Sequence, residues 1–522
     1  MLFSCYNYII VLIVCGGWRL AKFVGEEKRM VKVSKNFIPE ISVKCYDYFC
    51  TWQSQADYAK KKHGDVRDMR NSINSEFLFS EDGVLKNYFK GNRENIIVVL
   101  DDGWDVPYDA SNYDFTDYSA FGSLELNEDR FPQFAGEPRE RLKKLCDCIK
   151  GMGYAGVGIW VCANAVGEKE ENCLSEAEMR EYWKERAKWC EYAGVEYWKV
   201  DWGIYEHDIA FRKMLTEIVH EYAPNLKIEH SVPQDAWHFG TENETIMDEY
   251  EGVLPISDYF RTYDVLSKLE TAVTLYRITE CIHASESANA SECILNVEDE
   301  LEIAAALGCS AGIMRHPKWM PERDNKIRAV LNWHKIAPPF PLGATPIKLS
   351  KQTLTDTYSF KDLREGHWLY EIANGKTAEI ECPAIIARNT ELPVVTSKGE
   401  APFVVCSLNP SSGAYTIGFL KRTFGGAENR ELLCDAEIQL SDFKAPIGIF
   451  GRFSKITVRF DESIRGARLY MQKLDVEETF DITHCVNDAG DSFTIDSDEL
   501  VDNGILMEAN GILLQLEPEK NF

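Results

Sequence analysis

The sequence lacks an excess of basic residues. Its 522 residues include 57 Lys and Arg against 84 Asp and Glu, so the formal net charge is 57 − 84 = −27. Neutralising phosphates and docking on anionic lipid both need a basic face, so we expect neither nucleic acid nor an anionic membrane as a partner. Apolar residues make up 45% and charged residues 27% of the chain, a balance typical of globular proteins.

Long apolar runs and paired-cysteine motifs are also missing. The apolar run at residues 9–15 is too short to cross a bilayer, and it lacks the basic flank and small-residue cleavage site of a secretory signal. We therefore favour a cytoplasmic location over secretion and expect no membrane span. The 16 cysteines form no CxxC pair, so we expect buried reduced thiols rather than a zinc ribbon or a thioredoxin-like site.

Several familiar catalytic motifs do not occur. The chain contains no HExxH, no Walker A loop and no GxSxG. Residues 151–156 match GxGxxG, but a dinucleotide site needs that motif after a strand and at the start of a helix. Here the motif closes an expected helix and opens a strand, so we do not predict a nucleotide cofactor.

Short apolar runs alternate with amphipathic stretches from about residue 42 to residue 340. Runs without polar positions predict strands that are buried on both faces, as in parallel sheets. The expected strands include residues 96–100, 155–160, 195–200, 256–260 and 309–314, and the expected helices include 142–149, 176–190, 211–222 and 298–307. This order favours a (β/α)8 barrel over a doubly wound sheet.

The pattern changes after residue 340. Apolar residues then recur at every second position and turn residues separate the runs, which predicts an all-β sandwich over residues 341–522. We interpret residues 1–41 as a leader or peripheral segment. The expected fold class is therefore α/β: a catalytic barrel over residues 42–340 followed by a β-sandwich domain.

Polar residues stand where the expected barrel strands end. Barrel enzymes collect their chemistry at this edge. The residues concerned are Asp101, Asp102, Lys199, Asp201, Glu229, Arg261, Asp264 and Arg315.

Asp201 is the first candidate for a catalytic residue. It follows a strand that should be buried, and Trp198 and Trp202 flank it, so its charge needs a partner. Lys199 lies two residues earlier on the same strand face, and a purely structural Asp–Lys pair would explain both residues. Asp101 and Asp102 are similarly ambiguous, since they suit sugar hydroxyls, a metal ion or a helix cap.

Five motifs in order carry a family resemblance: LDDGW at 100–104, RFP at 130–132, GVGIW at 156–160, WKVDWG at 198–203 and FRTYD at 260–264. The chain resembles the clan of retaining α-galactosidases, which includes the family 27 α-galactosidases and α-N-acetylgalactosaminidases and their family 36 relatives. The likeness spans about residues 42–340, and that family also joins a barrel to a C-terminal β domain.

The resemblance implies a role for each matching residue. Asp201 would be the nucleophile and Asp264 the general acid and base. The substrate-binding residues would be Trp52, on the first strand, as the pocket floor, Trp160 as a lining residue, Asp101 and Asp102 for the 4- and 6-hydroxyls, Lys199 and Arg261 for ring hydroxyls, and Ser231 beside carbon 2. No metal and no organic cofactor is needed, because two carboxylic acids suffice to cleave an acetal with retention. The partner would be a carbohydrate.

The sequence departs from the family pattern in ways that leave alternatives open. Arg261 and Asp264 are one residue closer than in the family, so Asp258 is a second candidate for the acid. Ser231 stands where galactosidases often have a glutamate that contacts the 2-hydroxyl. An α-galactosidase, an α-N-acetylgalactosaminidase and a β-L-arabinopyranosidase therefore remain possible, as does a sugar-binding barrel without catalysis.

Overall fold

The computed structural model describes residues 30–40, 43–65, 68–110, 121–164, 174–232, 244–262, 270–288, 290, 292–315, 323–344, 346–359, 377–425, 428–502 and 510–518. Two sequence-based expectations fall outside these ranges. They are the apolar run at 9–15 and the assignment of Asp264 as the acid.

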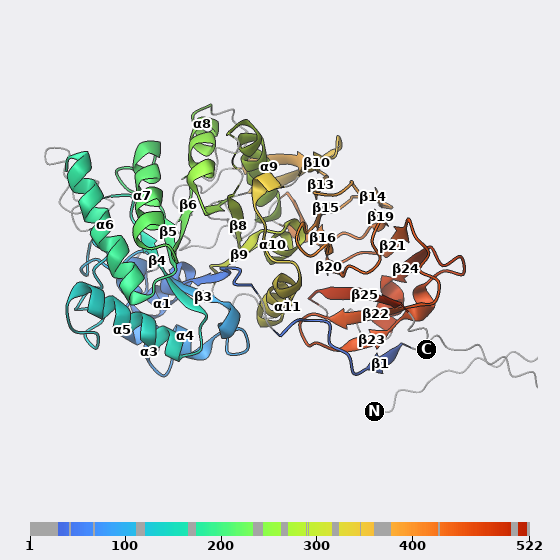
Figure 1. The fold of residues 1–522 in the computed structure, drawn as a ribbon, viewed down its shortest axis with the longest axis horizontal. Helices are drawn as coiled ribbons and strands as arrows, with labels where there is room; N and C mark the ends of the chain where they lie inside the picture. Colours follow the sequence, from blue (N-terminus) through green and yellow to red (C-terminus); the bar gives the residue numbers. More distant parts are fainter. Residues whose placement is uncertain are drawn as a thin grey trace, which may run out of the picture.

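Eight parallel strands form a closed barrel, which confirms the predicted fold class and excludes the doubly wound sheet (Figure 1). The strands in order are β2 (Tyr48–Cys50), β3 (Ile97–Leu100), β4 (Gly156–Val161), β5 (Tyr197–Val200), β6 (Lys227–His230), β7 (Tyr259–Arg261), β8 (Ile294–Glu298) and β9 (Ser310–Ile313). The barrel closes where β2 pairs with β9. Strands such as β3 and β4 read as apolar runs because helices cover their outer faces and side chains fill the interior.

Helices connect the strands of the barrel. The helices of the barrel region are α1 (Trp52–Lys62), α2 (Met69–Ser72), α3 (Ser75–Phe79), α4 (Val84–Asn87), α5 (Pro138–Gly151), α6 (Glu176–Ala193), α7 (Ile209–Tyr222), α8 (Glu244–Val253), α9 (Glu270–Ala288), α10 (Leu301–Leu307) and α11 (Arg323–Ile336). A capping box between Ser175 and Glu178 starts α6, and Gly194 ends it at a φ of 75°. The GxGxxG segment joins the end of α5 to the start of β4, as predicted.

Three predicted boundaries were wrong. The strand expected at 256–260 begins only at Tyr259, because Leu254–Ile256 form a 3-10 turn. The helix expected from residue 298 begins at Leu301, and Glu298 instead ends β8. Trp52, expected on the first strand, is the first residue of α1, because β2 ends at Cys50.

The C-terminal part is a sandwich of two sheets. The larger sheet has nine strands in the order β1 (Val31–Val33), β23 (Thr479–Asp481), β22 (Ala467–Lys473), β25 (Ile512–Pro518), β20 (Ile447–Gly451), β16 (Tyr415–Leu420), β15 (Phe403–Leu408), β13 (Ile385–Arg388) and β10 (Ile347–Leu349). The smaller sheet has the order β14 (Val394–Thr396), β19 (Asp435–Leu440), β21 (Lys455–Phe460) and β24 (Ser492–Asp496). Two ribbons complete this part, one of β11 (Thr353–Ser359) with β12 (Thr377–Pro383) and one of β17 (Arg422–Phe424) with β18 (Glu428–Arg430).

The two sheets bury one apolar core between them. Ile417 and Leu514 of the larger sheet and Val458 and Phe493 of the smaller sheet belong to the same buried cluster. The alternating burial of β19, exposed at every second residue, is the pattern that predicted a sandwich. Strand β1 pairs with β23, so residues 31–33 form an edge strand of the C-terminal sheet.

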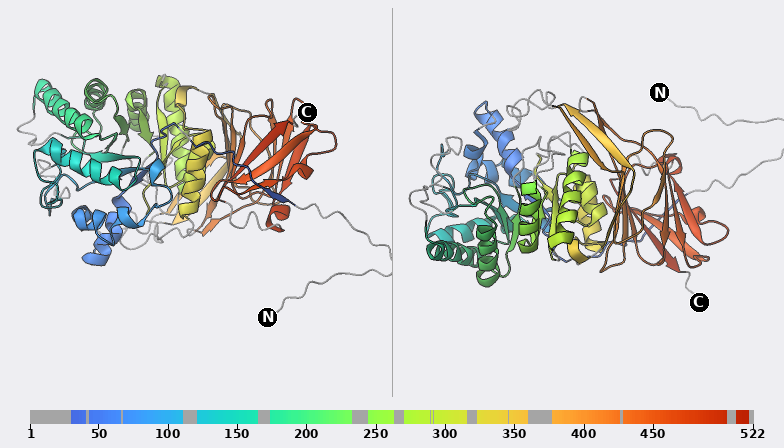
Figure 2. Two further views of the ribbon diagram at one scale, coloured as in Figure 1. Left: turned by 60° about the horizontal axis from the view of Figure 1, so that its bottom comes forward. Right: turned by 90° about the horizontal axis from the view of Figure 1, so that it is seen from above.

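Helices α10 and α11 connect the barrel to the sandwich, as Figure 2 shows from two sides. Trp333 of α11 lies against Gly448 of β20, and its indole N–H donates to Thr416 Oγ1 of β16 at 3.0 Å. Buried Arg388 of β13 donates to the carbonyls of Leu307 and Phe340, each at 2.8 Å. These contacts fix the larger sheet against the side of the barrel formed by β8 and β9.

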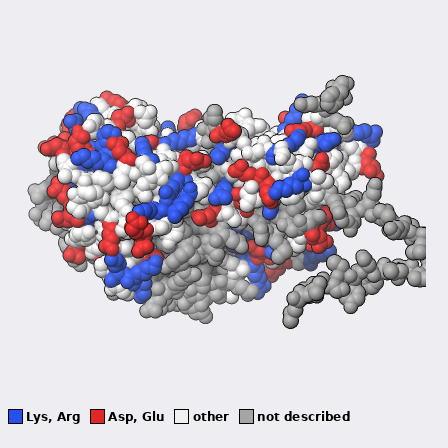
Figure 3. Space-filling view, turned by 90° about the horizontal axis from the view of Figure 1, so that it is seen from below, with Lys and Arg blue, Asp and Glu red and all other residues white. Residues whose placement is uncertain are grey.

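Acidic and basic side chains are interspersed on the face shown in Figure 3, over its described residues. Among the helices of the described residues, none combines the length and the apolar content needed to cross a membrane. Most of the described cysteines are buried thiols, as the sequence predicted.

Candidate active site

Polar side chains from four strands of the barrel meet at the carboxyl ends of these strands. Asp101 follows β3, Asp201 follows β5, and Arg261 and Glu298 are the last residues of β7 and β8. All eight strands are parallel, so their carboxyl ends lie at one edge. Side chains that are up to 197 positions apart in the sequence, as 298 − 101 shows, are therefore brought together.

The Asp201 carboxylate is held between two donors. Its Oδ1 accepts from Arg261 Nη2 at 2.8 Å and its Oδ2 accepts from Trp160 Nε1 at 3.0 Å. Burial opposes ionisation of this acid, but Arg261, Lys199 and Trp160 outweigh it, so the pKa of Asp201 is lowered. The side chain keeps 13% of its surface exposed, whereas Arg261 is fully buried. An ionised carboxylate therefore faces the barrel mouth.

Lys199 does not pair with Asp201, in contrast to the Asp–Lys pair considered from the sequence. Its ammonium lies 3.0 Å from Asp101 Oδ2, 3.3 Å from Glu298 Oε1 and 3.3 Å from Cys50 Sγ. Burial and Arg261 oppose this charge, but the surrounding acids outweigh them and raise the pKa of Lys199 well above its ordinary value. The three N–H donors of the ammonium are thus directed at protein atoms.

Arg261 is shared among several acceptors. Beside Asp201, its Nη2 donates to Ser231 Oγ at 3.0 Å, its Nε lies 3.7 Å from Glu229 Oε1, and its Nη1 lies 3.9 Å from Glu298 Oε2. Ser231 is fully buried, and its hydroxyl also contacts the carbonyl of Val200 at 3.4 Å. The protein itself therefore engages both the donor and an acceptor position of this hydroxyl.

Four acids and two cations form what we term the barrel cluster: Asp101, Asp201, Glu229, Glu298, Lys199 and Arg261. With more acids than cations, one acid is expected to hold a proton. Glu229 is that acid, because burial, reinforced by Glu298, raises its pKa to about 7. Glu298 differs: burial opposes its ionisation, but Lys199, Arg261 and Tyr48 lower its pKa.

Asp102 belongs to a separate ion pair at the mouth. Arg70 of α2 donates to both of its oxygens, from Nε at 2.9 Å and from Nη2 at 2.5 Å. Burial nevertheless raises the pKa of Asp102. Arg70 lies over the rings of Phe121 and Trp202, with 4.9 and 5.6 Å to their centroids. This pair joins the segment between β2 and β3 to the wall of the site.

Aromatic rings line one side of the site. Trp160 and Trp202 lie with their centroids 5.3 Å apart, and Phe121 lies 5.1 Å from Trp202. Trp160 and Phe121 are fully buried, whereas Trp202 is partly exposed beside Asp201. Trp52 is also partly exposed, and it packs on the interior residues of the barrel around Tyr48 and Cys50. An apolar ring face next to an ionised carboxylate is a surface that a sugar can use.

The structure bears differently on the two sequence-based candidates for the general acid. Asp264 lies outside the described residues. Asp258 is excluded, because it precedes β7 at the opposite end of the barrel and pairs with His220 and Lys227 at 3.2 and 3.3 Å. Glu206 is a further candidate among the described carboxyls: it follows β5, and burial and the charge of Asp201 raise its pKa.

No metal centre is built at the mouth from the described residues. In these ranges, the one group of three His, Cys or carboxylate side chains with ligand atoms within 4.8 Å of each other lies in the C-terminal sandwich. Lys199 and Arg261 occupy the space between the acids of the barrel cluster, where a cation would otherwise bind.

Three residues of the site were missed from the sequence. Glu298 ends an apolar run, 294–298, much as the other polar residues end theirs, and this signal was assigned to a helix. Tyr48 donates to Glu298 Oε1 at 2.7 Å, and only the barrel closure brings them together. Arg70 had no local signal, although a buried Asp102 needs a cation.

No protein-family model and no curated protein sequence matches the chain. Solved structures do. A GH27 β-L-arabinopyranosidase from Geobacillus stearothermophilus matches with 10% identity and a TM-score of 0.39 over 93% of this chain and 97% of that chain. A proposed α-N-acetylgalactosaminidase from Bacillus halodurans matches with 11% identity and a TM-score of 0.39 over 93% of this chain and 100% of that chain. An Anoxybacillus α-amylase matches with 9% identity and a TM-score of 0.44 over 92% of this chain and 100% of that chain. At such values the matches do not identify the reaction, which has to be inferred from the side chains.

Proposed function

We propose that the chain is a retaining glycoside hydrolase that releases terminal α-linked galactose. Asp201 is the nucleophile and Asp264 the general acid and base. The observation that supports this most is the state of Asp201: a partly exposed carboxylate at the end of a barrel strand, kept ionised by Arg261 and Trp160.

The chemistry needs two carboxyl groups with different protonation. An acetal has a poor leaving group, so the acid protonates the leaving oxygen while the nucleophile attacks the anomeric carbon. Asp264 donates this proton, and Asp201 forms the glycosyl ester. Asp264 then removes a proton from water, which attacks the ester and restores the Asp201 carboxylate. Retention requires the two carboxyl groups to lie roughly 5–5.5 Å apart.

The free acceptor positions indicate which acid binds the sugar. An ionised carboxylate has about four acceptor positions. Asp101 uses three of them, for Cys50, Lys199 and the backbone N–H of Asp102. Asp102 uses two, both for Arg70. We therefore propose Asp102 as the main acceptor for a sugar hydroxyl, with Asp101 and Lys199 holding the cluster in place behind it.

A panel of nitrophenyl glycosides tests the activity. We expect turnover of the α-D-galactopyranoside. The panel includes the α-N-acetylgalactosaminide and the β-L-arabinopyranoside because the departures from the family pattern, such as Ser231, leave these alternatives open. No turnover of any of the three by pure protein would leave the sugar-binding barrel as the better proposal.

The Asp201→Asn variant tests the nucleophile. It removes the charge but keeps the shape, and we expect a loss of kcat by more than about 10³-fold. Asp101→Asn is the matched control, since it changes an acid of the same cluster that does not attack the substrate. Azide added to Asp201→Ala should restore turnover of the nitrophenyl substrate and give an inverted glycosyl azide. Near-normal activity of Asp201→Asn would refute the assignment.

A further inference from the structure

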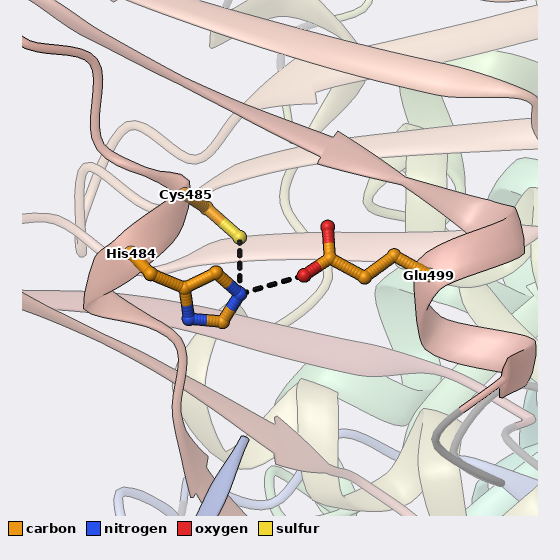
Figure 4. A group of neighbouring side chains, drawn as sticks. All are labelled: His484, Cys485 and Glu499. Atoms are coloured by element: carbon orange, nitrogen blue, oxygen red, sulfur yellow. Dashed lines mark hydrogen bonds and ion pairs between the residues drawn. The ribbon is translucent and has the colours of Figure 1, made fainter. Parts of the chain in front are cut away.

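Three potential ligand groups converge in the C-terminal sandwich (Figure 4). His484 and Cys485 come from the 3-10 turn η8 (Thr483–Cys485), and Glu499 comes from the short helix α13 (Ser497–Asp502). His484 Nε2 lies 2.7 Å from Glu499 Oε1 and 3.7 Å from Cys485 Sγ. The three ligand atoms all lie within 4.8 Å of one another.

Both backbone segments are anchored, so the convergence does not depend on loose surface side chains. The hydroxyl of Thr483 accepts from the backbone N–H of Leu469 and donates to Asp481 Oδ1, at 3.1 and 2.6 Å. In α13, Leu500 is buried in the sandwich core, and the backbone N–H of Ser497 donates to the Ser454 carbonyl at 2.9 Å. The two segments hold the three side chains from opposite sides of one point.

The contacts do not form a proton relay. In a relay of the Ser–His–Asp kind, the acid and the nucleophile bond to different nitrogens of the ring. Here the thiol and the carboxylate both contact Nε2 of His484. A ring nitrogen carries either a proton or a lone pair, so it cannot donate to Glu499 and accept from Cys485 at the same time. A cation at the centre of the three groups binds all of them at once.

We propose that His484, Cys485 and Glu499 bind a divalent transition-metal ion, with zinc as the expected occupant and water as the fourth ligand. Imidazole, thiolate and carboxylate together select zinc over magnesium or calcium, which take oxygen ligands alone. Tetrahedral bonds of about 2.3 Å to sulfur and about 2.0 Å to nitrogen place S and N about 3.5 Å apart, close to the observed 3.7 Å. The side chains of His484 and Glu499 are 20% and 33% exposed, so an ion and its water can enter.

Binding of the ion changes the protonation of the three side chains and adds a link between two backbone segments. Cys485 loses its thiol proton to solvent, and the neutral ring of His484 keeps its proton on Nδ1. The ion then links the η8 turn to α13, two segments that β24 otherwise connects. This role is independent of the barrel mouth and of the proposed glycosidase activity.

Zinc binding by the full-length chain tests the proposal. Protein stripped with a chelator in a phosphine reductant is titrated with ZnCl2 in competition with a chromogenic chelator. We expect one high-affinity ion per chain. His484→Gln, Cys485→Ser and Glu499→Gln should each weaken binding at least about 100-fold, since losing only the hydrogen-bond partner of a metal ligand costs about 10–100-fold. Cys148→Ser, a half-buried cysteine of α5, is the matched control and should bind as the wild type does.

Cobalt provides a second readout that identifies the sulfur ligand. Co²⁺ bound to the wild type and to Cys148→Ser should give a thiolate charge-transfer band in the near ultraviolet, and Cys485→Ser should lack it. Circular dichroism establishes that each variant is folded. The proposal is overturned if the wild type holds no zinc, or if any one of the three ligand variants binds zinc as tightly as the wild type.

Discussion

Glu229 should make the protein less stable as the pH rises. Its side chain is fully buried between Tyr197, which donates to Oε2 at 2.8 Å, and the guanidinium of Arg261. Burial raises its pKa to about 7 from the ordinary value of 4.5. The unfolded chain therefore releases this proton at lower pH than the folded chain does, and stability is lost between pH 4.5 and 7.

The magnitude follows from these two values. Raising the pKa of Glu229 from 4.5 to about 7 lowers the unfolding free energy by about 3 kcal/mol at a pH where Glu229 is ionised in both the folded and the unfolded chain. Between pH 5 and pH 8 the linkage relation gives a loss of about 2–3 kcal/mol from this one group. Glu229→Gln keeps the shape and cannot ionise, so its stability relative to the wild type should rise by that amount over the same range.

Urea unfolding at several pH values, followed by tryptophan fluorescence, measures this difference. Comparing variant with wild type at each pH cancels the titration of the other acids. Glu298→Gln is the comparison variant, because the pKa of Glu298 itself is lowered. Its charge also helps to raise the pKa of Glu229, so this variant should gain some stability between pH 5 and 8, but less than Glu229→Gln gains. A stability difference for Glu229→Gln that does not change with pH would show that Glu229 is ionised in the fold, and the proposed proton distribution would be wrong.

Two further predictions concern the mouth of the site. Arg70→Met leaves buried Asp102 without its cation, so we expect urea unfolding to show a loss of about 3–5 kcal/mol in unfolding free energy. The double variant Arg70→Met with Asp102→Asn also removes the buried charge, so its loss should be much smaller. Asp264→Asn should slow hydrolysis of an unactivated disaccharide far more than that of a nitrophenyl galactoside, which needs little protonation. If Glu206→Gln shows that selectivity instead, Glu206 is the acid.

The barrel could be predicted because its strands carry a strong local signal. Strands β3, β4 and β5 are buried on both faces and are rich in apolar residues, and Asp101 and Asp201 directly follow β3 and β5. The boundary of β8 was misjudged because Glu298 and the acidic residues after it resemble the first turn of a helix. Local sequence does not distinguish a strand-end carboxylate from a helix-start carboxylate.

The pairing inside the site could not be predicted in the same way. Lys199 and Asp201 are two residues apart, and proximity in sequence favoured a pair between them. The twist of β5 and the closure of the barrel instead direct Lys199 to Asp101 and Glu298, and Asp201 to Arg261. Each of these contacts joins residues of different strands, so it depends on how the strands of the barrel are aligned with one another. A short sequence motif does not determine that alignment.

The proton on Glu229 also bears on how Asp201 works. Arg261 lies 2.8 Å from Asp201 and 3.7 Å from Glu229, so a neutral Glu229 leaves the charge of Arg261 to the nucleophile. When Glu229 ionises near pH 7, the two acids compete for that charge. The proposed general acid also loses its proton as the pH rises, so two groups would contribute to an alkaline decline in kcat/KM. Glu229→Gln separates them, since the decline that remains in this variant belongs to the acid alone.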